Sequence, residues 1–299
     1  MSSFYDNRSY WTSLHTKFKG ELKAVGHPFL SESLNQLKYE SEAATVILAL
    51  KKIMDAFGQM DRKRLSVLDV GAGYGYWTGL IYDLLSKNGF GVNASALDVS
   101  IDALDVIQER LPHIHPIHGD LRSIAINQFA ESFDFVFSCY CLHHLTHAND
   151  FLNALQFVGQ SVNNGGFLLI MDPVLTMPFS KADTLDFQSF HGNGIPRHLY
   201  YVDDLLAGFG LRRCLVLPAV SFLLNENIQA PDKLSYYIMM AMWKLVCRLD
   251  RIDHLIEKTA GMWGYVDSLL KRHDLGFSSS VCVYHKAKSG SNVSALFGL

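Results

Sequence analysis

The spacing of hydrophobic residues divides the first part of the chain into a helical and a strand-like segment. From about Ser41, apolar residues recur every three or four positions as far as Phe57, which predicts an amphipathic helix. A short and mostly apolar run at 65–70 then ends at Gly71, as is typical of a buried parallel strand. The chain is therefore expected to change from helix to strand at about residue 65.

Strand-like and helix-like segments alternate along the middle of the chain. We expect strands at 94–99, 114–118, 133–139 and 167–171, and helices at 101–110 and 151–162. After Asp172 the pattern predicts a helix at 201–209, a strand at 212–220, two or three helices within 225–275, and a last strand at 276–285. Such alternation indicates βαβ units, and so an α/β fold with helices on both faces of a parallel sheet.

Composition narrows the class of protein. Of 299 residues, 49% are hydrophobic and 18% are charged, which indicates a folded globular chain. The net charge of −3 and the lack of basic clusters disfavour nucleic acid and membranes as partners. The N-terminus has no apolar core like that of a signal peptide, and the five cysteines form no CxxC pair. We expect a soluble cytoplasmic protein, and the sequence leaves a homodimer open.

The residues at 67–76, Val-Leu-Asp-Val-Gly-Ala-Gly-Tyr-Gly-Tyr, carry the strongest chemical signal. Glycines between a strand and a helix permit positive φ angles and let a ligand contact bare backbone. A nicotinamide fingerprint would place its third small residue at Tyr76, which is too large. The acid that ends the second strand, Asp98, comes 98 − 69 = 29 residues after Asp69, whereas the fingerprint has its acid about 20 residues after the glycines. Both observations argue against a nicotinamide oxidoreductase, which remains an alternative.

Together with four later segments, this turn resembles the class I S-adenosylmethionine-dependent methyltransferase family. The matching segments are 68–75, 96–100, 118–121, 133–145 and 164–170. The resemblance implies S-adenosylmethionine as the cofactor and a Rossmann-like, doubly wound sheet of seven mostly parallel strands. By the same resemblance, the last strand, at 276–285, is inserted antiparallel.

The resemblance also implies which residues hold the cofactor. Asp98, with Val99 beside it, is expected at the ribose, where a carboxylate facing a diol makes two charge-assisted hydrogen bonds. Asp120 and Leu121 are expected at the adenine. The remaining candidates lie toward the methionine portion and the methyl group: Asp69, Gly71, Gly73, Gly75 and Ser138. Apart from the resemblance, segment 35–40 is either a solvated helix start or closes over the methionine carboxylate with Tyr39 or Lys38.

Two histidines after the fourth strand are candidates for the catalytic base. By the resemblance, His143 occupies the position of a histidine that removes a proton from the methyl acceptor, and its neighbour His144 is the second candidate. An unperturbed histidine accepts a proton near neutral pH, so activity should rise with pH through about 6.5. In the alternative interpretation, one of the two histidines only caps the backbone.

No metal site is predicted. His113 and His115 would share one face of a strand, but His118 would point to the other face. By the resemblance, magnesium-dependent members need an acid after the fourth strand, and this chain has Ser138 and Cys139 there instead. Members that methylate bases in nucleic acids carry an Asp/Asn-Pro-Pro-aromatic sequence at the same place, and this chain does not.

These expectations divide the chain into a core and three additions. Residues 65–220 and 276–287 form the methyltransferase core, 1–64 an N-terminal helical extension or lid, 221–275 a helical cap insertion over the substrate pocket, and 288–299 a loose tail. The Met and aromatic side chains between Tyr236 and Trp243 are expected to serve as both core and pocket wall.

The predicted activity is methyl transfer to a small, largely apolar acceptor, as in specialised metabolism. Oxygen is the favoured target atom, and nitrogen or carbon remains open. Besides the oxidoreductase, one other alternative is a protein of this fold that binds the cofactor without methylating anything.

Overall fold

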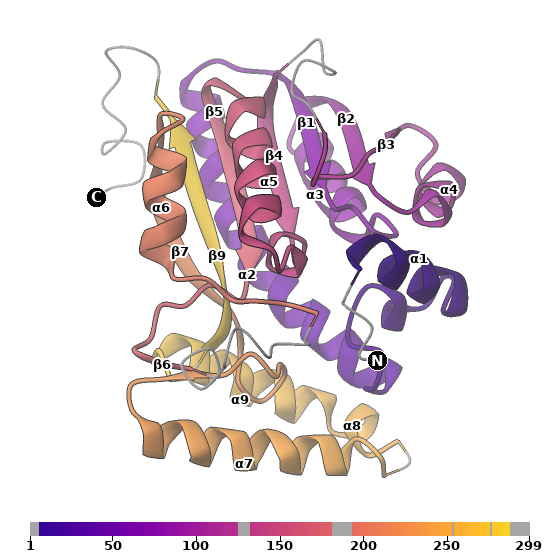
Figure 1. Cartoon of the computed structure of the whole chain (residues 1–299), viewed down its shortest axis with the longest axis vertical. Helices are drawn as coiled ribbons and strands as arrows, with labels where there is room; N and C mark the ends of the chain where they lie inside the picture. Colours follow the sequence, from indigo (N-terminus) through magenta and orange to yellow (C-terminus); the bar gives the residue numbers. More distant parts are fainter. Residues whose placement is uncertain (1–5, 125–131, 181–192, 253, 276, 288–299) are drawn as a thin grey trace.

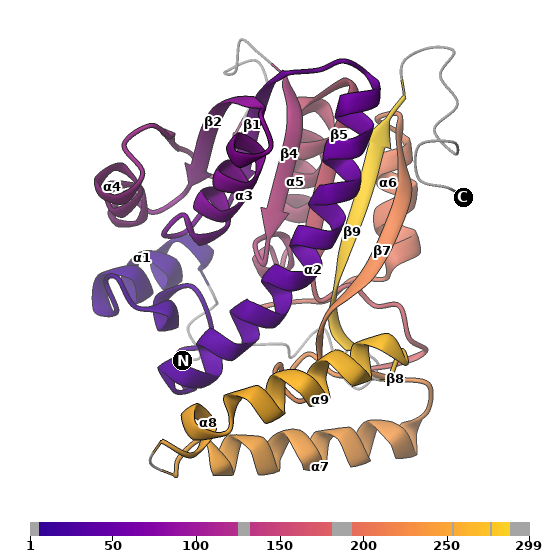
Figure 2. The same cartoon turned by 180° about the vertical axis from the view of Figure 1, so that it is seen from behind.

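A seven-stranded sheet forms the centre of the computed structural model, which describes residues 6–124, 132–180, 193–252, 254–275 and 277–287 (Figures 1 and 2). Its strands are β1 (Arg64–Val70), β2 (Gly91–Asp98), β3 (His115–His118), β4 (Phe133–Cys139), β5 (Val162–Asp172), β7 (Leu211–Ser221) and β9 (Phe277–Lys286). Their order is β3-β2-β1-β4-β5-β9-β7. β9 is antiparallel to both of its neighbours, β5 and β7. The predicted doubly wound sheet with an inserted antiparallel last strand is confirmed.

Helices cover both faces of this sheet (Figures 1 and 2). One face carries α2 (Glu32–Gln59), α3 (Tyr76–Lys87) and α4 (Ile101–Arg110), and the other carries α5 (Ala148–Ser161) and α6 (Leu199–Ala207). Because side chains alternate along a strand, Phe135 and Phe137 of β4 pack into the core of the first face, whereas Val136 packs into that of the second. All three side chains are fully buried, so the sheet lies between two apolar layers.

The N-terminal helices extend further than the apolar pattern predicts. The helix expected from Ser41 begins at Glu32, where the Ser31 hydroxyl accepts the Leu34 N–H at 3.1 Å. Leu34 and Leu37 in its first turns are buried against the outer helices described below, so tertiary packing extends this helix. A further helix, α1 (Asn7–Lys17), is polar except for scattered aromatics and is capped by Asp6. A short 3₁₀ turn, η1 (Leu22–Ala24), joins α1 to α2.

Three outer helices form a layer beyond the carboxyl ends of the central strands (Figure 1). They are α7 (Lys233–Leu249), α8 (Leu255–Lys258) and α9 (Ala260–Arg272). Two short antiparallel strands, β6 (Phe179–Ser180) and β8 (Gln229–Ala230), contact α7. Among the described residues, no helix has the length and apolar character required to cross a membrane. The predicted loose tail, 288–299, lies outside the described residues.

A buried ion pair ties the outer layer to the core. Asp267 on α9 is 1% exposed, and its carboxylate accepts the Ser221 N–H of β7 at 2.8 Å and the hydroxyl of Ser41 on α2. Lys271, one helical turn later, lies 3.4 Å from the same carboxylate and donates to the Ser41 carbonyl at 3.0 Å. One carboxylate therefore joins α9, β7 and α2.

We predict that Asp267→Ala lowers the free energy of unfolding by about 3–5 kcal/mol, because it leaves the Lys271 ammonium largely buried without its counter-charge. Asp83→Ala is the matched control, since Asp83 and Lys87 form an ion pair of the same helical spacing with side chains 60% and 73% exposed. The control should change stability by less than about 1 kcal/mol. Urea unfolding of both variants tests this, and equal losses would contradict a special role for Asp267.

Candidate functional site

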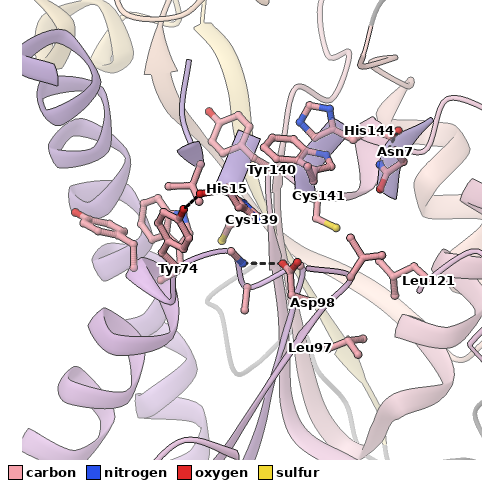
Figure 3. A pocket seen from close by; sticks show the side chains of 18 of the residues that line it. Asn7, His15, Tyr74, Leu97, Asp98, Leu121, Cys139, Tyr140, Cys141 and His144 are labelled. Carbon is pink, nitrogen blue, oxygen red and sulfur yellow. Dashed lines mark hydrogen bonds between the residues drawn. The ribbon is translucent and has the colours of Figure 1, made fainter. Parts of the chain in front are cut away.

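A cavity of about 830 Å³, including space open to solvent, lies where β1, β2 and β4 end (Figure 3). It is bordered by the turn after β1, the ends of β2 and β3, the segment after β4, and side chains of α1 and α2. In doubly wound sheets, ligands bind at this edge, outside the carboxyl ends of the strands. We call it the first cavity.

The glycine turn after β1 forms the floor of the first cavity. Gly71, Gly73 and Gly75 have φ angles of 78°, 51° and 77°, a region that favours glycine. A Cβ atom on Gly71 would lie 2.3 Å from the Cys141 Sγ, so no larger residue fits there. Asp69, fully buried below the turn, accepts the Thr78 hydroxyl at 2.6 Å, and burial raises its pKa to about 8. Asp69 therefore anchors the first turn of α3.

The Asp98 carboxylate lies beside this turn and fixes it. One oxygen accepts the Gly73 N–H at 2.8 Å (Figure 3), and the other accepts the Ser100 N–H at 2.9 Å. The side chain is 7% exposed and lines the first cavity. A carboxylate can accept about four hydrogen bonds, so both oxygens keep capacity for a ligand.

Asp120 lies at the far end of the first cavity in an ion pair with Arg122. The guanidinium donates to both Asp120 oxygens, at 2.7–3.0 Å, and to Asp6 at 2.9 Å. Burial alone would raise the pKa of Asp120, but the hydrogen bonds from Arg122 outweigh it and keep that pKa below its usual value. Since Asp6 caps α1, Arg122 also attaches that helix to this end of the cavity.

Aromatic rings of α2 and α3 close the opposite side. Tyr39 is 3% exposed, and its ring lies stacked 5.5 Å from Trp77 and edge-on 4.7 Å from Tyr76. Its hydroxyl donates to the Val25 carbonyl at 2.9 Å. Since this hydroxyl is already bonded, Tyr39 contributes mainly its ring to the lining of the cavity.

A second cavity, of about 1380 Å³ including space open to solvent, adjoins the first. Trp11, Val25, Tyr140 and His144 line both. The Tyr140 hydroxyl donates to Glu42 at 2.5 Å, and the Lys38 ammonium lies 2.8 Å from the same carboxylate and 4.0 Å from the centre of the Tyr140 ring. Tyr140 has a φ of 54°, so its packing against α2 holds the backbone in a rarely populated conformation between the two cavities.

The wall of the second cavity differs from the one predicted. Residues 225–229 line it, but no residue of 233–275 that the structure describes lines either cavity. Trp243 is buried in an apolar cluster with Leu34 and Leu37 of α2. The expectation that the Met and aromatic stripe forms a pocket wall is wrong, because β8 and the loop before it contribute the wall and pack against α7.

His143 and Asp172 form a buried pair at the second cavity. His143 Nδ1 lies 2.7 Å from Asp172 Oδ1, and the two side chains are 10% and 7% exposed. The backbone N–H groups of Leu142 and His143 favour the charged form of Asp172 and so act to lower its pKa. Burial, with Arg197 and Lys38 nearby, lowers the pKa of His143 to about 3, while burial raises that of Asp172 to about 7. The pKa of His143 thus lies far below the value of about 6.5 used in the sequence prediction.

His144 lies between the two cavities. Its Nδ1–H donates to the Asn193 carbonyl, and its ring lies 3.8 Å from that of His143 and 4.7 Å from that of Trp11. Burial and the adjacent His143 lower its pKa to about 3. The two candidate bases therefore lie side by side, and the carboxylate partner belongs to His143.

Residues 67–166, which span the turn, the strands and the histidines described above, match the family model of the methyltransferase domain. This part of the chain is a methyltransferase domain, in agreement with the resemblance of the sequence to the class I S-adenosylmethionine-dependent methyltransferases. S-adenosylmethionine is accordingly its cofactor. A comparison with curated proteins found no match.

The chain is similar to solved structures of methyltransferases at low sequence identity. A putative sarcosine dimethylglycine methyltransferase from Galdieria sulphuraria is 15% identical, with a TM-score of 0.50, over 95% of this chain and 99% of that one. The putative methyltransferase in complex with the Haloferax volcanii Trm112 activator is 14% identical, with a TM-score of 0.46, over 77% and 86%. The mitomycin 7-O-methyltransferase MmcR is 20% identical, with a TM-score of 0.40, over 51% and 44%.

Most of the predicted cofactor residues of this methyltransferase meet at the first cavity. The residues that line it are Tyr39, Gly71, Gly73, Asp98, Val99, Asp120 and Leu121. Asp69, Gly75 and Ser138 do not, and the Ser138 hydroxyl is buried and donates to the Val70 carbonyl at 3.0 Å. These three residues support the segments that border the cavity but do not line it themselves.

Sequence reasoning missed the contribution of α1. Asn7, Trp11 and His15 line the first cavity, although α1 has no regular apolar spacing that would reveal it. It also missed Asp172 as the partner of His143. An acid ending the fifth strand, at the same sheet edge as the histidines, was the available signal.

For the glycine turn, we predict that Gly71→Ala lowers the free energy of unfolding by about 1–3 kcal/mol through backbone strain and adds a further loss through its clash with Cys141. Gly89→Ala is the matched control, since Gly89 has a φ of 85° but no atom within 4 Å of the new Cβ. Urea unfolding should therefore show the smaller loss for Gly89→Ala. Adding Cys141→Ala to the Gly71→Ala protein should restore part of the lost stability, because it removes the clashing sulfur atom. Equal losses in Gly71→Ala and Gly89→Ala, with no gain from Cys141→Ala, would show that the clash is absent.

Proposed function

We propose that this methyltransferase transfers the methyl group of S-adenosylmethionine to a hydroxyl oxygen of a small molecule that occupies the second cavity. The observation that supports this proposal best is the His143–Asp172 pair beside the cofactor cavity. A histidine oriented by a carboxylate is a common way to hold a base that must accept a proton at one defined nitrogen.

The proposed cofactor position follows from the groups around the first cavity. Asp98 would accept the two ribose hydroxyls, and Asp120 with Leu121 would lie at the adenine. Gly71, Gly73 and the Tyr39 ring would border the methionine portion, and aromatic faces there suit a sulfonium cation. The methyl group would then face Tyr140, at the boundary of the second cavity.

The proton inventory of the histidine pair explains how it would act. When the pair is deprotonated, His143 Nδ1–H donates to the Asp172 carboxylate and leaves a lone pair on Nε2. When the pair gains a proton, that proton resides either on the imidazole or on the carboxyl that then donates to Nδ1. Nε2 carries a hydrogen in both cases, so only the deprotonated pair can act as the base.

The surroundings of the pair indicate the pH range. Since burial raises the pKa of Asp172 to about 7, the active form should increase as pH rises through about 7. Arg197 and Lys38 oppose a positive charge on His143, which favours the neutral imidazole. In this proposal the pH dependence belongs to the pair, and Asp172 contributes most of it.

The lining of the second cavity supports an acceptor with an apolar body and polar substituents. Trp11, Phe29 and Tyr140 offer aromatic surface, whereas Lys38 and Asn225 offer polar groups. Such a mixture fits a hydroxylated ring compound better than a uniformly apolar one. Most of the rate enhancement would come from aligning oxygen, methyl and sulfur in this cavity.

The proposed ribose contact predicts that Asp98→Asn weakens S-adenosylmethionine binding by roughly 1.5–3 kcal/mol, the range for hydrogen bonds to a charged group. Asparagine keeps the size of the side chain but can accept only one of the two backbone N–H groups, so thermal unfolding first checks that the variant is folded. Asp105→Ala, an exposed acid on the adjoining α4, is the control and should bind normally. Calorimetry that shows unchanged affinity for a folded Asp98→Asn protein would remove Asp98 from the site.

The proposed base predicts that His143→Ala keeps cofactor affinity and lowers the rate of methyl transfer by about 10²–10⁴-fold. Wild-type activity should rise with pH through about 7, and this rise should vanish in the variant. Asp172→Asn should also lose the rise, because it removes the carboxyl group whose pKa lies at about 7.

His144→Ala serves as the comparison for the choice between the two histidines. It should retain the pH-dependent rise, since the His143–Asp172 pair is intact. Methyl transfer to a panel of hydroxylated aromatic compounds is the measurement. Wild-type turnover in His143→Ala would reject the base.

A further inference from the structure

The N-terminal helix α1 brings one buried histidine to the wall of the first cavity. His15 is 2% exposed and lines that cavity, and Figure 3 shows it on the border of the same cavity as Asp98. Neither of its ring nitrogens has a hydrogen-bond partner among the described residues. Buried polar atoms are nearly always hydrogen-bonded in folded proteins, so an unpartnered imidazole at a ligand cavity indicates that the ligand supplies the partner.

The position of His15 is well fixed. Its ring lies 5.1 Å from that of Tyr74, and the Tyr74 hydroxyl donates to the His15 carbonyl at 2.6 Å. At the end of the same helix, the Thr16 hydroxyl donates to Asp102 at 2.7 Å. These contacts attach α1 to the glycine turn and to α4, the two elements that flank Asp98. The imidazole is therefore held in place before any ligand arrives.

We infer that His15 is a cofactor-binding residue that hydrogen-bonds a ribose hydroxyl of S-adenosylmethionine across from Asp98. This inference rests on the proposed placement of the ribose at Asp98. A neutral imidazole carries one donor and one acceptor, and a hydroxyl can satisfy either one. Asp98 can only accept, so the two residues would bind the diol in complementary ways.

The electrostatic surroundings agree with a neutral imidazole. Burial lowers the pKa of His15, and Asp98 and Asp102 oppose that shift without reversing it. The influence of Asp98 on His15 also means that the two side chains lie within electrostatic range of each other. Both side chains line the first cavity, so a ligand bound there has both at its border.

The test is calorimetry on the full chain with S-adenosylhomocysteine and with its 2′-deoxyribose and 3′-deoxyribose analogues. His15→Phe keeps a ring against Tyr74 but removes both nitrogens. It should weaken S-adenosylhomocysteine binding roughly three- to tenfold, the worth of a neutral hydrogen bond. The analogue that lacks the hydroxyl bound by His15 should bind wild type and His15→Phe equally well.

Two further variants separate this role from a structural one. His285→Phe removes another buried imidazole without a hydrogen-bond partner among the described residues. This ring lies 4.7 Å from that of Phe167 and borders neither cavity, so the variant should bind S-adenosylhomocysteine as tightly as wild type does. His15→Gln keeps a donor and an acceptor at this position, so it should bind S-adenosylhomocysteine more tightly than His15→Phe does. If His15→Phe does not fold, His15→Gln is compared with wild type for the two deoxyribose analogues instead.

The outcomes distinguish the inference from the proposal beneath it. The role of His15 would be overturned if His15→Phe bound S-adenosylhomocysteine as tightly as wild type does. It would also be overturned if His15→Phe weakened the binding of both deoxyribose analogues by the same factor. Either result would leave the ribose at Asp98. If the wild-type protein binds both analogues as tightly as S-adenosylhomocysteine, neither residue contacts the diol, and the placement of the ribose fails too.

Discussion

Two hydrogen bonds to the Asp98 carboxylate fix the floor of the first cavity. They join the glycine turn after β1 to the turn after β2, at the edge of the sheet where the parallel strands end. The positive φ angles of the glycines are tolerable because no side chain is present, and the carboxylate then fixes the one conformation that leaves space for a ligand. The other walls of the cavity, contributed by α1, α2 and the segment after β4, are arranged around this fixed turn.

The second constraint lies at Tyr140, which separates the two cavities. Its strained backbone follows β4, while its hydroxyl reaches Glu42 on α2 and Ser279 on β9. Three elements that are distant in sequence therefore meet at one side chain. Lys38 balances the charge of Glu42 there and places a cation beside the proposed acceptor site, within electrostatic range of His143. The arrangement links the shape of the acceptor cavity to the charge state of the proposed base.

Local sequence patterns predicted the parts of this structure that local physics determines. Buried apolar runs predicted the strands, and the backbone freedom of glycine predicted the turn at the sheet edge that borders the first cavity. The structure confirms the sheet that these strands form. α1 was not located because its helix is stabilised by Asp6, Arg122 and Tyr74 rather than by an apolar stripe. The role of the Met and aromatic stripe was misjudged for a similar reason. A side chain such as Trp243 is equally suited to a core and to a pocket wall. Here residues 225–229 line the second cavity, and Trp243 is buried in the outer apolar cluster.

The 28 residues of α2 form a continuous rod that connects distant layers of the molecule. Phe57 near one end is buried against the sheet, whereas Tyr39 and Lys38 border the two cavities, and Leu34 packs into the outer helices. At 1.5 Å per residue, Tyr39 is about 27 Å from Phe57, so a tilt of about 5° around the sheet end would move it by roughly 2 Å. Substitutions in α7 or α9 that shift the N-terminal end of α2 would therefore change the shape of both cavities, although these helices line neither.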